Sequence, residues 1–195
     1  MEHQSSNLAK HQTSNPVVRR LIDGYFNVLL DVVREQRPVT VLDVGCGEGF
    51  AAEQLKKLPF DIDYLGVDLN ASAVAYAREH VTGRRFEVAD VRDLGARAAD
   101  LVICLEVLEH LDDPTQGIDA LAGAAGKGVV VSVPWEPWFR LGNLARGKYL
   151  GRLGNHPEHV QQFGPRSIQA LLETRFDGVQ TRTAFPWVFA WGRCR

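Results

Sequence analysis

Three glycines in alternate positions follow a short, mostly apolar run near residue 45. Val39–Val44 has the length of a buried strand, and Phe50–Leu58 has the apolar spacing of a helix. Gly45, Gly47 and Gly49 lie between them. Glycine adopts positive φ angles at low cost and lets a ligand approach the backbone closely. The segment therefore predicts a strand, a tight turn and a helix, with a ligand-binding turn at their junction.

Apolar runs and helical patterns continue to alternate along the chain, which predicts a parallel sheet with right-handed crossovers. Further strands are expected at Ile62–Val67, Arg85–Ala89, Leu101–Leu105 and Gly128–Val133, and further helices at Val17–Gln36, Ala71–His80, Thr115–Ala125 and from Pro165 to about Arg175. Only Pro186 separates Phe176–Phe185 from Trp187–Cys194, so these two strands must be antiparallel. We expect an α/β, Rossmann-like fold: a seven-stranded, mostly parallel sheet with one antiparallel C-terminal strand and helices on both faces.

The length of 195 residues favours a single domain. Residues 1–14 are polar and are expected to form a flexible tail, and 15–195 the domain. Asn15 and Pro16 are suited to the N-cap and first position of a helix. That N-terminal helix, 15–37, is expected to cover the ligand site.

The composition of the chain restricts which classes of partner and which cellular compartment we expect. The formal net charge is −2, which disfavours a dedicated nucleic-acid-binding protein. Three cysteines do not make a disulfide framework, and no apolar run resembles a signal peptide or reaches the roughly 18 residues of a spanning helix. A cytoplasmic protein is expected, and nothing in the sequence indicates its oligomeric state.

The carboxylates around the turn indicate which ligand it suits. Asp68 ends the second strand, where an acid can bond ribose hydroxyls. A dinucleotide is one alternative, but the spacing is G-x-G-x-G and not G-x-G-x-x-G. Asp43 and Glu48 would also repel a pyrophosphate. An adenosyl ligand with cationic groups, such as S-adenosyl-L-methionine, fits better. A turn without a ligand is the other alternative, disfavoured because three glycines weaken a helix start and no packing requirement for them is evident.

Four ordered segments carry a resemblance to a known family. They are Asp43-Val44-Gly45-Cys46-Gly47-Glu48-Gly49, Leu65–Leu69, Phe86–Val91 and Leu101–Leu111. Together they resemble the class I S-adenosylmethionine-dependent methyltransferases, in particular the small-molecule branch that includes the ubiquinone and menaquinone methyltransferases. The resemblance extends from about Val39 to Pro134.

The resemblance implies roles for individual residues. Asp43 would orient the methionyl ammonium, Asp68 would bond the ribose, and Asp90 would accept from the adenine amine beside the Val91 N–H. Leu105 and Glu106 would flank the methyl-bearing centre. The cofactor-binding positions implied are Asp43, Gly45, Cys46, Gly47, Asp68, Leu69, Asp90, Val91, Leu105 and Glu106.

Methyl transfer from a sulfonium depends mainly on positioning, although some acceptors need a general base. His159, in a segment resembling one at the rim of the family's acceptor pocket, and His110 are the candidates. Ordering a loop is an alternative role for His159, and an ion pair or a contact with a covering helix for His110. No metal is expected, because the sequence has no C-x-x-C or H-x-x-x-H pair.

The segment 135–157 follows the fifth strand and is predicted to form a lid over the acceptor. From Pro137 to Pro157 it carries four basic residues and no acid, and it is rich in aromatics. Substrate contacts are expected from Trp135, Trp138, Arg140 and Tyr149. Two alternatives remain open: peripheral membrane contact, and an ordinary amphipathic connection.

The predicted function is methyl transfer from S-adenosylmethionine to an oxygen, nitrogen or carbon of a small-molecule acceptor. The alternatives are a methyltransferase acting on a membrane-associated lipid or prenylated acceptor, and a non-catalytic S-adenosylmethionine-binding protein.

Overall fold

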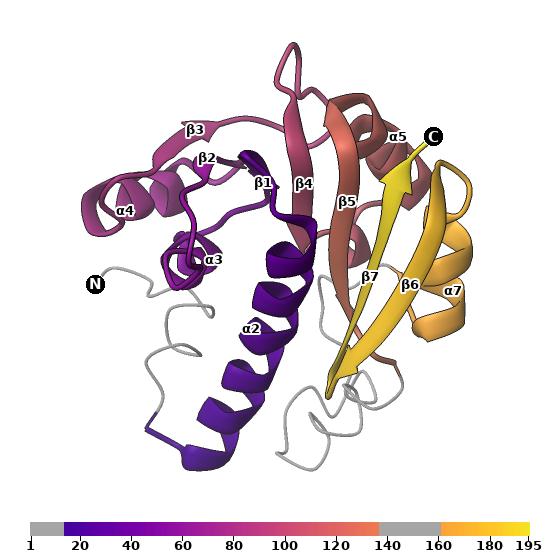
Figure 1. The fold of residues 1–195 in the computed structure, drawn as a ribbon, viewed down its shortest axis with the longest axis horizontal. Coiled ribbons are helices and arrows are strands. Elements are labelled where there is room, and N and C mark those ends of the chain that lie inside the picture. Colours follow the sequence, from indigo (N-terminus) through magenta and orange to yellow (C-terminus); the bar gives the residue numbers. More distant parts are fainter. Residues whose placement is uncertain (1–13, 137–160) are drawn as a thin grey trace.

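Seven strands form one sheet in residues 14–136 and 161–195, the part of the chain that the computed structural model describes. The strand order is β3-β2-β1-β4-β5-β7-β6 (Figure 1). The strands are β1 (Thr40–Val44), β2 (Asp63–Asp68), β3 (Arg85–Val88), β4 (Ala99–Leu105), β5 (Ala125–Pro134), β6 (Phe176–Ala184) and β7 (Trp187–Cys194). The chain runs outward from β1 to β3, then returns to place β4 on the other side of β1.

The direction of the strands confirms the expected topology. β1 pairs in parallel with both β2 and β4, and parallel pairing continues to β3 and β5 at either side. β7 is antiparallel to both of its neighbours, β5 and β6. The reversal follows from the short connection between β6 and β7, which leaves no length for a crossover.

Three of the described helices begin at a residue whose side chain caps them. The helices are α2 (Pro16–Gln36), α3 (Phe50–Leu55), α4 (Ala71–His80), η1 (Leu108–His110), α5 (Pro114–Ala124) and α7 (Pro165–Leu172). The side chains of Asn15, Asn70 and Asp113 accept the first free N–H groups of α2, α4 and α5. α3 and α7 end earlier than predicted, because the residues after Leu55 and Leu172 include i to i−3 turn bonds.

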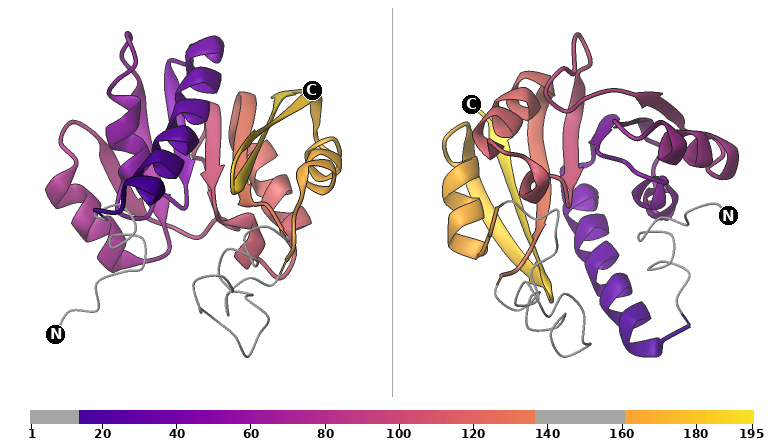
Figure 2. Two further views of the ribbon diagram at one scale, coloured as in Figure 1. Left: turned by 90° about the horizontal axis from the view of Figure 1, so that it is seen from below. Right: turned by 180° about the vertical axis from the view of Figure 1, so that it is seen from behind.

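The helices cover both faces of the sheet, as expected. α2, α3 and α4 pack in one apolar core, which Leu101 and Ile103 of β4 join. α5 and α7 pack in a second core with Val102 and Cys104, whose side chains point to the opposite face. α2 crosses the sheet on one face while α5 and α7 lie on the other (Figures 1 and 2). Because neither face is left open, ligand binding is directed to the edge where the strands end.

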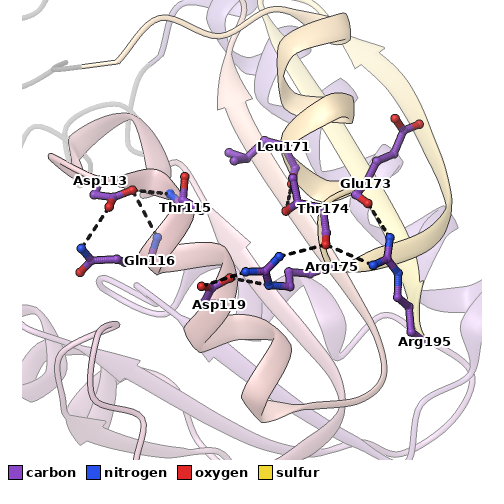
Figure 3. A network of polar contacts seen from close by, with 9 residues as sticks. All are labelled: Asp113, Thr115, Gln116, Asp119, Leu171, Glu173, Thr174, Arg175 and Arg195. Carbon is purple, nitrogen blue, oxygen red and sulfur yellow. Dashed lines mark hydrogen bonds and ion pairs between the residues drawn. The ribbon is translucent and has the colours of Figure 1, made fainter.

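A polar network joins α5 to the turn after α7 (Figure 3). The Arg175 guanidinium contacts both carboxylate oxygens of Asp119, with Nε–Oδ1 2.7 Å and Nη2–Oδ2 3.2 Å. Arg175 and Arg195 both donate to the Thr174 carbonyl, and Arg195 also donates to the carbonyl of Glu173. The network fixes the last residues of the chain to the outer helices.

Replacing Arg175 with methionine is expected to lower the free energy of unfolding by no more than about 1 kcal/mol. Both side chains of the ion pair remain nearly half exposed, so water screens the attraction. Urea unfolding measures the change, and Arg166→Met, at an exposed arginine of α7, is the control. A loss above about 2 kcal/mol relative to that control would show that the network stabilises the fold more than an exposed pair can.

No helix in the described ranges is long and apolar enough to span a membrane.

Candidate functional site

Four parallel strands end at the same edge of the sheet. Val44 of β1 pairs with Val67 of β2 and with Cys104 of β4, and Leu105 of β4 pairs with Ser132 of β5. The residues after these pairs therefore converge beside β1. β2 and β4 lie on opposite sides of β1, so the strand order reverses here, and this is where open α/β sheets bind ligands.

The glycine turn is anchored to the second strand. The N–H groups of Gly45 and Cys46 both donate to the Val67 carbonyl, at 2.8 and 3.0 Å. Gly45, Gly47 and Gly49 have φ angles of 80°, 51° and 82°. This left-handed region is disfavoured for residues with a Cβ, so the backbone path of the turn requires glycine.

The three glycines of the turn differ in how much space a side chain would have. A Cβ on Gly45 would lie 2.2 Å from Cγ2 of Val107, and one on Gly49 would meet Val81 at 2.9 Å. Leaving aside its two chain neighbours, no described residue has an atom within 4 Å of the place a Cβ on Gly47 would occupy. The expectation that no packing requirement explains the glycines is therefore wrong for Gly45 and Gly49, whose neighbours come from distant segments. Only Gly47 leaves open space beside the turn.

Gly45→Ala is expected to lower the free energy of unfolding by about 2 kcal/mol or more, because the methyl group overpacks against Val107 at a positive φ. Gly24→Ala is the matched control. Gly24 lies in α2, and no described residue outside the helix backbone beside it comes within 4 Å of its Cβ position, so the same change should stabilise the helix by up to about 1 kcal/mol. Denaturant unfolding of both variants checks the difference, and equal effects would contradict the account of the turn.

Asp68 joins the end of β2 to the turn. Its Oδ2 accepts the Gly47 N–H at 2.8 Å, and its Oδ1 accepts the Asn70 N–H at 2.8 Å. The carboxylate therefore holds Gly47 at the one open position of the turn. Each carboxylate oxygen has a second lone-pair site for another donor, which suits ribose hydroxyls.

Asp43 lies beneath the turn and is 1% exposed. The Tyr64 hydroxyl donates to Oδ2 at 2.5 Å, while Oδ1 is buried with no hydrogen-bond partner among the described residues. Burial raises the pKa of Asp43 to about 7, the Tyr64 hydrogen bond opposes this, and the Asp68 carboxylate adds to it. A buried acceptor without a donor is costly, so this oxygen fits a cationic donor such as the ammonium of an amino acid moiety.

Asp90 lies two residues after the end of β3, and the Arg92 side chain binds it. The Arg92 side chain contacts both oxygens, with Nε–Oδ1 2.9 Å and Nη2–Oδ2 2.5 Å. These bonds, together with the Arg92 backbone N–H, lower the pKa of Asp90 to about 2. The expected adenine contact would therefore share this carboxylate with Arg92. Leu69, the residue after β2, is 68% exposed, and Val91, the residue after Asp90, is partly buried. Both offer apolar surface to an adenine ring.

The residue that follows β4 has an unusual backbone conformation. Leu105 is partly buried, and Glu106 has a φ of 57°, which is rare for a residue with a Cβ and is found often at functional sites. The Glu106 N–H donates to the Ser132 carbonyl at 3.0 Å. His110 is exposed at the end of η1.

All three cysteines are free thiols in the structure. Cys46 and Cys104 are buried, and burial raises the pKa of each thiol. Cys46 takes part in the turn through its main-chain N–H and through its thiol, which donates to the Gly47 carbonyl at 3.8 Å. Among residues 14–136 and 161–195, no group of three or more potential ligands could hold a metal ion.

Only the margins of the acceptor side lie within the residues that the structure describes. The ring of Trp135, which follows β5, meets that of Phe185 edge-on at 6.5 Å between centroids. Phe185, in the β6–β7 turn, is 51% exposed. His159, Trp138, Arg140 and Tyr149 lie outside the described residues, as does most of the segment 135–157.

Several residues at this edge carry no motif that marks them in the sequence. Tyr64 reaches Asp43, and Val107 reaches Gly45, only because distant segments meet in the fold. Ser132 had a weak signal, as a polar residue within the apolar run Gly128–Val133. Phe185 had none beyond its place before Pro186.

Comparisons with known proteins agree with this geometry. A family model described as "Methyltransferase domain" matches residues 42–131. A ubiquinone biosynthesis O-methyltransferase of Xanthomonas axonopodis pv. citri is 39% identical over 164 residues, and the match covers 75% of this chain and 67% of that protein. The chain belongs to the S-adenosylmethionine-dependent methyltransferase family. The family uses S-adenosylmethionine as its methyl donor.

Solved methyltransferase structures share the fold over nearly the whole chain. Magnesium protoporphyrin IX methyltransferase from Synechocystis PCC 6803, with bound SAH, has a TM-score of 0.70 and 19% identity, and the match covers 98% of this chain and 96% of that one. The plantazolicin methyltransferase BpumL, in complex with a pentazolic desmethylPZN analog and SAH, has a TM-score of 0.70 and 16% identity, and the match covers 96% of this chain and 93% of that one.

Other curated relatives are longer than the matched region. Ubiquinone biosynthesis O-methyltransferases of Saccharomyces cerevisiae, Hahella chejuensis and Alkalilimnicola ehrlichii are 34–35% identical over 89–95 residues. Those matches cover 28–39% of the relatives' own length. The matched region therefore spans less than two fifths of the length of each of these relatives.

Proposed function

We propose that this chain binds S-adenosylmethionine at the edge formed by β1, β2 and β4 and transfers its methyl group to a small-molecule acceptor. The buried Oδ1 of Asp43, without a hydrogen-bond partner among the described residues, carries the proposal. An anionic pyrophosphate would be repelled at this position, whereas a cationic amino acid moiety gives the oxygen a donor.

Different residues around Asp43 bind different parts of the ligand. Asp43 holds the methionyl ammonium, Gly47 leaves room for the ligand against the backbone, and Asp68 accepts from the ribose hydroxyls. Leu69, Asp90 and Val91 form the adenine end. Gly45 and Cys46 shape the turn through their main chain, and Leu105 and Glu106 flank the methyl-bearing centre.

Catalysis in this site rests on positioning. S-adenosylmethionine supplies a methyl group already activated by the sulfonium. The chain then has to hold the acceptor atom in line with the sulfur–methyl bond and exclude water, which accounts for much of the rate gain in such transfers. For an acceptor that must lose a proton, His110 and His159 are the candidate bases.

A phenolic hydroxyl on an apolar ring is the acceptor class to test first. Trp135 and the half-exposed Phe185 supply aromatic surface near the ends of β5 and β6. Several curated relatives are named for O-methylation in ubiquinone biosynthesis. A lipid-linked acceptor at a membrane surface is the alternative.

For the domain organisation, we propose residues 15–195 as one domain. Within it, 15–37 is a helix cap and 135–157, including Trp138, Arg140 and Tyr149, is an acceptor-side lid.

The reducing cytoplasm is the compartment we propose, because Cys46, Cys104 and Cys194 are all free thiols in the structure.

Turnover is tested with methyl-labelled S-adenosylmethionine and a fractionated metabolite extract that contains hydroxylated aromatics. Label is expected in an acceptor fraction with the wild type and not with Asp43→Asn. If S-adenosylhomocysteine binds but no fraction is labelled, the chain is a non-catalytic binding protein. If labelled product partitions only with lipid, the membrane-associated acceptor replaces the soluble one.

A further inference from the structure

A buried hydrogen bond joins the N-terminal helix to the end of β5. The Oη of Tyr25, in α2, and the Oγ of Ser132, in β5, lie 2.6 Å apart. Tyr25 is 5% exposed and Ser132 is fully buried. The two residues are 107 positions apart in the sequence, so this contact exists only in the folded chain.

Ser132 also holds the residue that follows β4. Its carbonyl accepts the Glu106 N–H at 3.0 Å, immediately after the pairing of Leu105 with Ser132. Glu106 has the left-handed φ of 57°, a conformation that costs about 1–3 kcal/mol and persists only where surrounding contacts impose it. Ser132 therefore contacts α2 through its side chain and Glu106 through its main chain.

The Tyr25 ring is fixed from several sides. It meets Phe189 and Trp187 of β7 at centroid distances of 4.7 and 5.0 Å, and Phe26 at 5.3 Å. With the ring held, the direction of its hydroxyl is held as well. A shift of α2 would thus be transmitted to Ser132.

Tyr25 is near the acidic side of the site and stays protonated. Burial raises the pKa of Tyr25 well above its usual value, and the carboxylates of Glu106, Glu109 and Asp43 raise it further. A phenol that keeps its proton acts as a hydrogen-bonding group and not as a base.

We propose that Tyr25 and Ser132 form a positioning pair that fixes Glu106 against the methyl-bearing centre of the ligand. The inference rests on the proposed function and deepens it, because it gives the N-terminal helix a defined part in aligning the methyl position. Tyr25 and Ser132 act through Glu106 and are positioning residues.

Two adenosyl ligands that differ at the methyl position test the pair. S-adenosylhomocysteine has a neutral thioether there, whereas sinefungin has an amine that is protonated at neutral pH and attracted to a carboxylate. Calorimetry gives both dissociation constants for the wild type, Tyr25→Phe, Ser132→Ala and the double variant. We expect each single variant to bind sinefungin at least about tenfold more weakly and S-adenosylhomocysteine less than about threefold more weakly. The double variant should lose no more than either single one.

Two further variants calibrate the result. Glu106→Gln should show the same selective loss, because it removes the carboxylate that the pair positions. Tyr76→Phe removes a tyrosine hydroxyl in α4, where the ring stacks on His80, and should leave both dissociation constants unchanged. The ratio of the two constants does not depend on the folded fraction, so a destabilised variant still gives a result.

Unchanged sinefungin affinity in both Tyr25→Phe and Ser132→Ala would overturn the positioning pair while leaving the proposed function standing. A wild type that binds neither ligand would overturn the proposed function, and the pair with it.

Discussion

Asp68→Asn is expected to weaken S-adenosylhomocysteine binding by about 10- to 100-fold, the range for losing hydrogen bonds to a charged group. The carboxylate accepts backbone N–H groups from Gly47 and Asn70 at once, and an amide can accept through only one of its two ends. The amide also removes the negative charge proposed to receive the ribose hydroxyls. Both the shape of the turn and the ligand contact are therefore affected.

Isothermal titration calorimetry measures this loss, and Asp63→Asn is its matched control. Asp63 begins the same strand, is exposed, and pairs with Arg85 at 2.8 Å, so its variant should bind as the wild type does. Circular dichroism of Asp68→Asn should show an intact fold. Equal affinities of the two variants for S-adenosylhomocysteine would contradict a role for Asp68 in binding the ligand.

S-adenosylhomocysteine is expected to bind more weakly as the pH falls through about 7. Burial raises the pKa of Asp43 to about 7, and the bound ammonium favours the ionised carboxylate. Below that pH Asp43 must lose its proton before it can pair with the ligand, so the affinity should fall by up to about tenfold per pH unit. Above about pH 8 the affinity should be constant. Dissociation constants between pH 5.5 and 8.5 check this, and calorimetry in buffers of different ionisation enthalpy should detect proton release near pH 7.

Two variants identify the titrating group as Asp43. Asp43→Asn should bind weakly at every pH, with no midpoint near 7. Tyr64→Phe should move the midpoint upward, because the Tyr64 hydrogen bond lowers the pKa of Asp43. A wild-type affinity that stays constant from pH 5.5 to 8.5 would contradict a role for Asp43 in binding the ammonium.

The fold was predictable because its signals are local. Caps at Asn15 and Asn70 and the alternation of strands with helices locate the elements. The short connection through Phe185 and Pro186 determines the direction of β7. Helix ends were less predictable, since the residues after Leu55 and Leu172 still favour a helix but form turns.

The site was predictable only where a motif marks it. Asp43, Gly47 and Asp68 follow from the glycine turn and its neighbouring strand. Contacts that depend on tertiary packing could not be found this way. Val107 fills the space beside Gly45, and Tyr64 donates to Asp43, although neither has a recognisable spacing from its partner.

The most direct measurement is a calorimetric titration of the wild-type chain at pH 8 with S-adenosylhomocysteine and, in parallel, with NAD. We predict one S-adenosylhomocysteine bound per chain and no heat of binding with NAD, since Asp43 and Glu48 disfavour a pyrophosphate at the turn. Binding of NAD without binding of S-adenosylhomocysteine would contradict the proposed cofactor site and the methyl transfer built on it.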